Sequence, residues 1–198
     1  TLFAQVVDNY ISPGITPVMN VNDGVLKFER FEGDLNNTGG TTDVWSLETV
    51  FTGQGILNVG FASVSGDYSQ DEVSTLLIEM AYLGGDLYSG YDTLDVSGTA
   101  SLDGVLQLDM LDSFAPELGD SFIIVSATNV QGEFDSVFSS AYLGQANGIN
   151  LRWELDYDIN LNGDDYVWAT VSYIPLPPAV WLFGSGLGLL GWMRRKPA

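Results

Sequence analysis

One stretch of the chain alternates strictly between apolar and polar residues. Between Leu151 and Leu161, every odd-numbered position is apolar and every even-numbered position is polar. Such a period of two indicates a β-strand with one buried and one solvated face, because successive side chains of a strand point to opposite faces. The same period returns over residues 166–173, after Asn162-Gly163. Because Asn-Gly tolerates the positive φ angles of a tight turn, the pattern predicts a long β-hairpin.

Shorter apolar runs between turn-forming residues predict further strands. They cover residues 24–31, 44–51, 55–61 and 74–81, and a further alternating pattern runs over residues 100–110. No apolar pattern of helical period continues for ten residues before residue 90. We therefore expect residues 1–173 to form an acidic, all-β, secreted domain, with 1–90 and 91–173 as candidate subregions.

The composition excludes several classes of function. Among the 198 residues there is no cysteine and no histidine, so His-dependent catalytic triads, thiolate or imidazole zinc sites and disulfides are ruled out. The 26 acidic and 6 basic residues give a formal net charge of −20, which argues against nucleic acid as a partner. Glycoside hydrolases use a pair of carboxylates, but among 26 acidic residues some pair will lie close together by chance, so such a pair is no evidence for catalysis. We expect no enzymatic activity and no organic cofactor.

The charge is divided between two segments. All 26 acidic residues lie before residue 174, whereas the last 25 residues carry only Arg194, Arg195 and Lys196 as charged side chains. Residues 174–193 form an uncharged stretch of 20 residues. As a helix, residues 176–193 would extend roughly 27 Å at about 1.5 Å per residue, close to the bilayer core of about 30 Å.

The pattern therefore predicts a proline motif at 175–178, a transmembrane α-helix at 179–193 and a basic tail at 194–196 that stays in the cytoplasm. Small residues common in membrane helices, including a GxxxG pair, lie within the helix, and tryptophans lie near its two ends. The glycines of the pair are Gly184 and Gly188, the tryptophans are Trp181 and Trp192, and Leu182 and Phe183 are large apolar residues of the same helix. The alternative is a buried apolar helix of a soluble domain.

The C-terminal segment from Ile174 to Lys196 resembles the PEP-CTERM sorting signal of Gram-negative bacteria, in its Pro-Leu-Pro and Trp-Leu-Phe-Gly-Ser-Gly variant. Leu176 stands where the family has Glu. The resemblance implies export, a transient anchor in the inner membrane, and recognition by an exosortase-type processing enzyme at Pro175, Pro177 and Pro178. It further implies delivery to the outer surface or extracellular matrix, with exopolysaccharide as a partner. Because the chain begins with Thr1, we interpret it as a fragment or a processed form.

A second resemblance covers the body of the chain. In residues 91–106, 116–124 and 130–134, apolar and polar residues alternate and glycines recur between the runs. This pattern is similar to that of domains in PEP-CTERM proteins and in autotransporter passengers. This resemblance implies a β-solenoid of the right-handed β-helix kind, or a related β-sandwich that ends in the long hairpin. A jelly-roll-like β-sandwich is the alternative.

One candidate binding site is a calcium loop. The first half of an EF-hand-like calcium loop is matched by Asp158, Asn160, Asn162 and Asp164, but Ala169 stands where the bidentate acid belongs. A hairpin turn explains the same residues without a metal, and we favour that interpretation.

Exposed aromatic side chains would allow a second function, a carbohydrate-binding or carbohydrate-active module carried on the same sorting signal. The candidates are Trp45, Tyr82, Tyr88, Tyr91, Trp153 and Trp168. Trp153 lies in the apolar phase of its strand and is expected in the core. Tyr88 and Tyr91 are expected to be the best-exposed pair.

Overall fold

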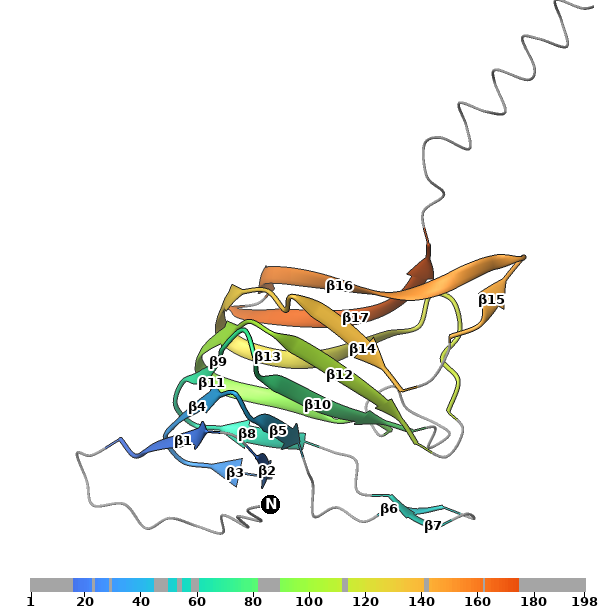
Figure 1. The fold of residues 1–198 in the computed structure, drawn as a ribbon. Coiled ribbons are helices and arrows are strands. Elements are labelled where there is room, and N and C mark those ends of the chain that lie inside the picture. Colours follow the sequence, from blue (N-terminus) through green and yellow to red (C-terminus); the bar gives the residue numbers. More distant parts are fainter. Residues whose placement is uncertain are drawn as a thin grey trace, which may run out of the picture.

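The computed structural model describes residues 16–22, 24–28, 30–44, 50–52, 55–57, 61–81, 90–111, 114–140, 143–161 and 163–174. Within these ranges the regular elements are β-strands, and none is a helix (Figure 1). Accordingly, no helix long and apolar enough to span a bilayer occurs among them. The expected proline motif, transmembrane helix and basic tail lie outside the described residues.

The strands form two main sheets and one separate antiparallel pair. Sheet A is mixed and contains β1 (Val18–Asn22), β3 (Arg30–Phe31), β4 (Asp34–Thr38), β8 (Phe61–Val64), β9 (Tyr68–Gln70), β11 (Thr93–Leu102), β13 (Ser121–Gly132), β15 (Gln145–Ala146), β16 (Ile149–Leu161) and β17 (Asp164–Tyr173). Sheet B is parallel and contains β2 (Val25–Phe28), β5 (Thr41–Val44), β10 (Thr75–Met80), β12 (Val105–Met110) and β14 (Ser136–Ser139). The separate pair is β6 (Val50–Thr52) with β7 (Gly55–Leu57).

The chain passes back and forth between the two sheets. From β9 to β14, successive strands alternate between sheet A and sheet B, and from β10 on each strand pairs in parallel with the previous strand of its own sheet. Both sheets contain strands from before and after residue 90. Antiparallel pairing enters sheet A at its C-terminal strands, where β17 joins β13, β16 joins β17 and β15 joins β16 (Figure 1).

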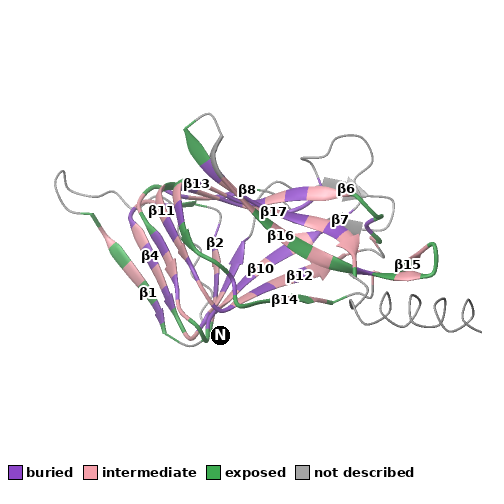
Figure 2. Cartoon of the chain, turned by 90° about the horizontal axis from the view of Figure 1, so that it is seen from above, coloured by how far each residue is buried: buried purple, intermediate pink, exposed green. Residues whose placement is uncertain are grey.

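The hydrophobic core is built from the inward-facing residues of both sheets. Along β10 and β12, Leu76, Ile78, Leu106 and Leu108 are fully buried and alternate with half-buried residues (Figure 2). Strands of sheet A contribute buried side chains in the same way, including Leu94. The period of two seen in the sequence is therefore the signature of one dry face per strand.

The hairpin prediction is confirmed, because β16 and β17 pair antiparallel along most of their length, with Trp153 opposite Val171. The strand predicted over residues 74–81 also agrees with β10. Gly163 adopts a φ of 100° at the turn of the hairpin, a conformation that glycine takes without steric cost. The inward residues Val167, Ala169 and Val171 are buried.

Three other strand predictions require correction. Residues 24–31 are not one strand, because β2 lies in sheet B and β3 lies in sheet A. Val44 ends β5, and residues 50–51 belong to the separate strand β6. Similarly, residues 55–57 form β7, whereas Phe61 begins β8 in another sheet.

The alternating pattern over residues 100–110 also divides into two strands, β11 and β12, that lie in different sheets. The chain turns between them at Gly104, which has a φ of 63°. Leu102 and Leu106 remain buried on either side of the turn. Since the apolar phase continues through the corner, periodicity alone does not reveal it.

Candidate functional site

A candidate binding surface lies on the outward side of sheet A, over β17 and the strands beside it. In β17 the odd-numbered residues from 165 to 171 are buried, so Tyr166 and Trp168 point outward and are half-buried. Tyr166 lies between Ser126 of β13 and Asp158 of β16. Trp168 lies between Ile123 of β13 and Asp156 of β16. Strand pairing thus flanks both aromatic rings with carboxylates.

A third carboxylate, Asp95 of β11, extends this surface. Its strand neighbour is Ser126, which in turn lies opposite Tyr166. Burial raises the pKa of Asp95 above its usual value, a hydrogen bond with Ser126 opposes this rise, and the charge of Asp164 adds to it. Asp95 is therefore a partly desolvated carboxyl that already has a hydrogen-bond partner. We refer to Asp95, Asp156, Asp158, Tyr166 and Trp168 as the aromatic-acidic face.

Two of the other aromatic candidates belong to the core. Tyr91 is only 5% exposed, and its ring centroid lies 5.1 Å from that of Phe122, edge to face. The prediction that Tyr91 is exposed is wrong, because its ring packs on Phe122 and its hydroxyl accepts a hydrogen bond of 3.3 Å from the Ile123 N–H. Trp153 packs against the core and Phe122, as its apolar phase predicted. Trp45, Tyr82 and Tyr88 lie outside the described residues.

The four calcium candidates are not assembled into a site by the described side chains. Asp158 lies within β16 opposite Tyr166, and Asp164 begins β17 opposite Leu161. The side chains of Asn160 and Asn162 lie outside the described part of the chain. Within that part, no group of three acidic side chains is placed to hold a metal ion.

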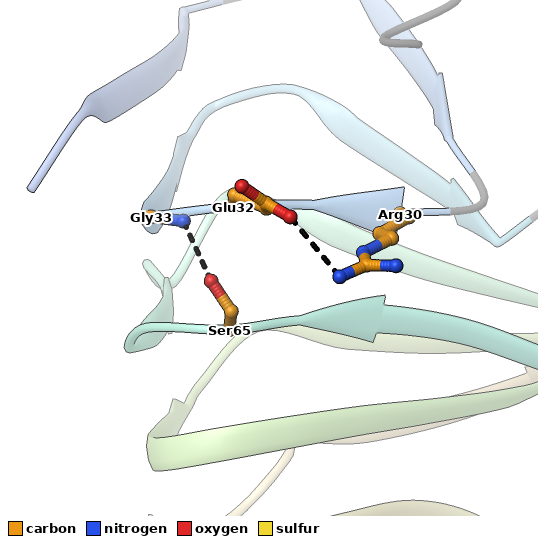
Figure 3. Close-up of polar contacts among 4 residues, drawn as sticks. All are labelled: Arg30, Glu32, Gly33 and Ser65. Atoms are coloured by element: carbon orange, nitrogen blue, oxygen red, sulfur yellow. Dashed lines mark hydrogen bonds and ion pairs between the residues drawn. The ribbon is translucent and has the colours of Figure 1, made fainter. Parts of the chain in front are cut away.

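The basic side chains of the described domain are held by carboxylates. Arg152 is exposed and lies 3.3 Å from Glu154, in a surface ion pair. Arg30 lies 3.0 Å from Glu32 (Figure 3). Lys27 on β2 contacts Asp43 on β5, with the lysine Nζ 2.5 Å from Asp43 Oδ2. None of these three cations belongs to the aromatic-acidic face.

A second group of charges lies on the outward side of sheet B. Asp43 is only 2% exposed, and its Oδ1 has no hydrogen-bond partner. Burial raises the pKa of Asp43, although the hydrogen bond and charge of Lys27 lower it. Burial also raises the pKa of the Glu79 carboxyl, and the charges of Asp43 and Asp109 add to this effect. The group consists of an ion pair with two further carboxylates nearby.

These pKa shifts predict that mild acid stabilises the protein. A carboxyl with a raised pKa binds a proton more readily in the folded chain than in the unfolded chain. The free energy of unfolding should therefore rise as pH falls from 7 through the raised pKa values of Glu79, Asp43 and Asp95. Denaturant unfolding at pH 7 and at pH 5 measures this change, and Glu79→Gln should reduce it. A steady loss of stability over this interval would contradict the prediction.

A ladder of glycines and aspartates, which the strand and motif patterns did not predict, bends sheet A. Gly33, Gly66 and Gly98 lie 33 and 32 residues apart in the sequence. Asp34 Oδ1 accepts a hydrogen bond of 3.0 Å from the Asp67 N–H, and Asp67 Oδ1 accepts one of 2.7 Å from the Thr99 N–H. In the sequence, Gly-Asp occurs at residues 33–34 and 66–67, and Gly98 follows at nearly the same spacing, a recurrence that indicates stacked turns.

The same bend carries a further cross-strand hydrogen bond. The backbone N–H of Gly33 donates to Ser65 Oγ at 3.1 Å, which ties the turn before β4 to the end of β8 (Figure 3). The Gly98 N–H donates to the Gly66 carbonyl oxygen at 3.0 Å. Each turn is thus fixed by the turn next to it.

Buried amides perform a similar task where the chain leaves sheet A for sheet B. Asn37 Oδ1 accepts a hydrogen bond from the Gly40 N–H, and its Nδ2 donates to the Thr75 carbonyl. Gln70 accepts a hydrogen bond of 2.8 Å from the Tyr68 hydroxyl and donates to the Asp103 carbonyl at 2.7 Å. Because unpaired buried polar groups are costly, these amides stabilise the corners.

Comparison of the chain with protein-family models finds no matching family, and comparison with curated proteins finds no matching protein.

Proposed function

We propose that this chain is a non-enzymatic protein of the cell surface or extracellular matrix of a Gram-negative bacterium, exported and sorted through a C-terminal signal of the PEP-CTERM kind. Residues 1–173 are the delivered domain, and residues 174–198 are the signal. The observation that carries the proposal is the division at residue 174, where the acidic sequence changes to a proline motif, an apolar stretch and a basic tail. Among the described residues the last strand is β17, which ends at Tyr173, immediately before this segment.

The delivered domain is proposed to be a β-solenoid related to the right-handed β-helices. Successive strands that alternate between two sheets, each in parallel with its predecessor, support this assignment. A jelly-roll-like sandwich is less well supported because jelly rolls pair their strands antiparallel. In the solenoid assignment, the hairpin of β16 and β17 covers the last parallel strand of sheet A.

A scaffold role is supported by how the stacked strands are connected. Besides the glycine-aspartate ladder, Asn36 Nδ2 donates to Asn20 Oδ1 at 3.1 Å, and Ser69 Oγ donates to Asn36 Oδ1 at 2.7 Å. These side chains lie on neighbouring strands in register. Side-chain ladders of this kind stiffen stacked strands. A rigid, strongly acidic domain suits a hydrated matrix, in which its charge also keeps it soluble.

The second candidate function is that of a carbohydrate-binding module on the same signal. The outward position of Tyr166 and Trp168, beside Asp156 and Asp158, favours it. The two functions are compatible, because a matrix scaffold that binds polysaccharide is both. A carbohydrate-active enzyme has weaker support, since the aromatic-acidic face lies on the outward side of a sheet.

The proposal predicts where the protein is found in its host. After fractionation of the native bacterium, an antibody against the delivered domain should detect it mainly on the outer surface and in the extracellular matrix. A variant that ends at Tyr173 should lose most of this surface pool and accumulate in the periplasm or the culture medium. Equal surface amounts of both proteins, or a cytoplasmic native protein, would contradict the proposal.

A further inference from the structure

The outward side of sheet A carries two neighbouring rows of side chains that run across the strands. In the first row, Phe61 of β8 lies opposite Thr93 of β11, and Thr93 Oγ1 donates a hydrogen bond to the Ile123 carbonyl of β13. Ile123 lies opposite Trp168, and Trp168 lies opposite Asp156. This row is largely apolar, with Phe61 54% exposed, and it ends at a carboxylate.

The second row is polar and acidic. It crosses β11, β13, β17 and β16 next to the first row, through Asp95, Ser126, Tyr166 and Asp158 respectively. Tyr166 and Trp168 are two residues apart on one strand, so their side chains lie on the same side of the sheet, roughly 7 Å apart along it. The surface therefore combines two aromatic rings with three carboxylates that are hydrogen-bond acceptors.

Such a surface favours a ligand that offers both apolar faces and hydrogen-bond donors. Sugar rings have this character, because their C–H faces pack on aromatic rings while their hydroxyl groups donate hydrogen bonds. The negative charge of the domain further limits the class of polysaccharide that it can bind. The three basic side chains of the described domain are engaged by Asp43, Glu32 and Glu154. An anionic polysaccharide would be repelled by this face and by the net charge of −20.

From this charge complementarity we infer that the aromatic-acidic face binds a polysaccharide that carries protonated amines, such as a partly deacetylated amino-sugar polymer. The ammonium groups lie against Asp156, Asp158 and the faces of the two aromatic rings, where a cation is attracted by the ring electrons. The sugar rings lie along the apolar row. This inference rests on the proposed function, since it names the matrix partner of the delivered domain.

The test measures binding of the full chain, kept in mild detergent, to three polysaccharides that differ in charge. These probes are a glucosamine polymer with free amines, its fully N-acetylated form, and polygalacturonate as the anion. Binding to the free-amine polymer is expected to be the tightest. The outcome that would overturn the inference is equal or tighter binding to the acetylated or the anionic polymer.

Variants separate this site from general attraction between opposite charges. Trp168→Ala should weaken binding to the free-amine polymer by about tenfold, the effect of one desolvated cation–π contact. Phe138→Ala is the matched control, because Phe138 is 59% exposed but lies on β14 in sheet B. It should leave the affinity unchanged. Poly-lysine serves as a polycation without sugar rings, and Trp168→Ala should weaken its binding less than it weakens binding of the free-amine polymer, because poly-lysine loses no contact between a sugar ring and Trp168.

A double variant that removes two carboxylate charges keeps the inference testable if Trp168→Ala fails to fold. The double change Asp156→Asn with Asp158→Asn should abolish the preference for the free-amine polymer over its acetylated form. Unchanged preference, or equal weakening by Phe138→Ala, would overturn the inference. Failure here is distinguishable from failure of the proposed function, because export and surface location are measured separately in the host.

Discussion

A Gly66→Ala variant is expected to lose roughly 3 kcal/mol of its free energy of unfolding. A Cβ atom at this position would lie within 3.0 Å of the Asp34 side-chain oxygen and of the Gly33 carbonyl oxygen. The carboxylate can rotate away only by giving up its hydrogen bond to the Asp67 N–H. The Gly33 backbone can move only by disturbing the turn that precedes β4. Denaturant unfolding of the variant and the parent protein measures the loss.

The matched control for this prediction is Gly119→Ala. Gly119 has a φ of 94°, but a Cβ atom there would meet nothing within 4 Å. Its cost is limited to the left-handed backbone conformation, about 1 kcal/mol. If Gly66→Ala were no more destabilising than this control, the close stacking of turns in sheet A would be contradicted.

Local sequence predicted the positions of only some strands, and it did not predict their partners. The run over residues 74–81 agrees with β10, whereas the runs over 24–31, 44–51, 55–61 and 100–110 each divide between two strands. The alternation over residues 151–161 and 166–173 fixes a hairpin because the turn residues lie between the two runs. The corner at Gly104 leaves no trace in the alternation, since Leu102 and Leu106 are buried in the same phase on both sides of it. Only the recurrence of Gly33, Gly66 and Gly98 at nearly equal spacing points to stacking of distant segments.

The candidate site was predictable only in part. Trp168 was among the candidate aromatic residues, and the phase of its strand is enough to place it outward. Tyr91 was misjudged because a flanking Ser-Gly turn suggested exposure, whereas its ring is buried against Phe122. Asp95 could not be connected with Tyr166 from sequence, because the register of three separate strands brings them into one row.

The second large effect is expected in the processing of the chain. Protein recovered from outside the cell should lack the residues from Trp181 to Lys196. An uncharged stretch of 20 residues is stable in a membrane but not in an aqueous matrix, where it would cause aggregation. The double variant Pro175→Ala with Pro177→Ala removes the proposed recognition element and should remain in the inner membrane with its tail intact.

The exchange of Leu176 for Glu provides the control for the processing prediction. It restores the Pro-Glu-Pro motif that gives the family its name and leaves the prolines, the apolar stretch and the basic tail unchanged. This variant should be processed at least as completely as the parent. Loss of processing in it would contradict the proposed role of the proline motif.

The mass of the mature protein, isolated from the extracellular matrix of its native host, tests the sorting proposal most directly. Intact-mass spectrometry with sequencing of the C-terminal peptide should place the new C-terminus at or near residues 175–178, after the delivered domain. An extracellular protein that still carries Arg194, Arg195 and Lys196 would contradict the proposal.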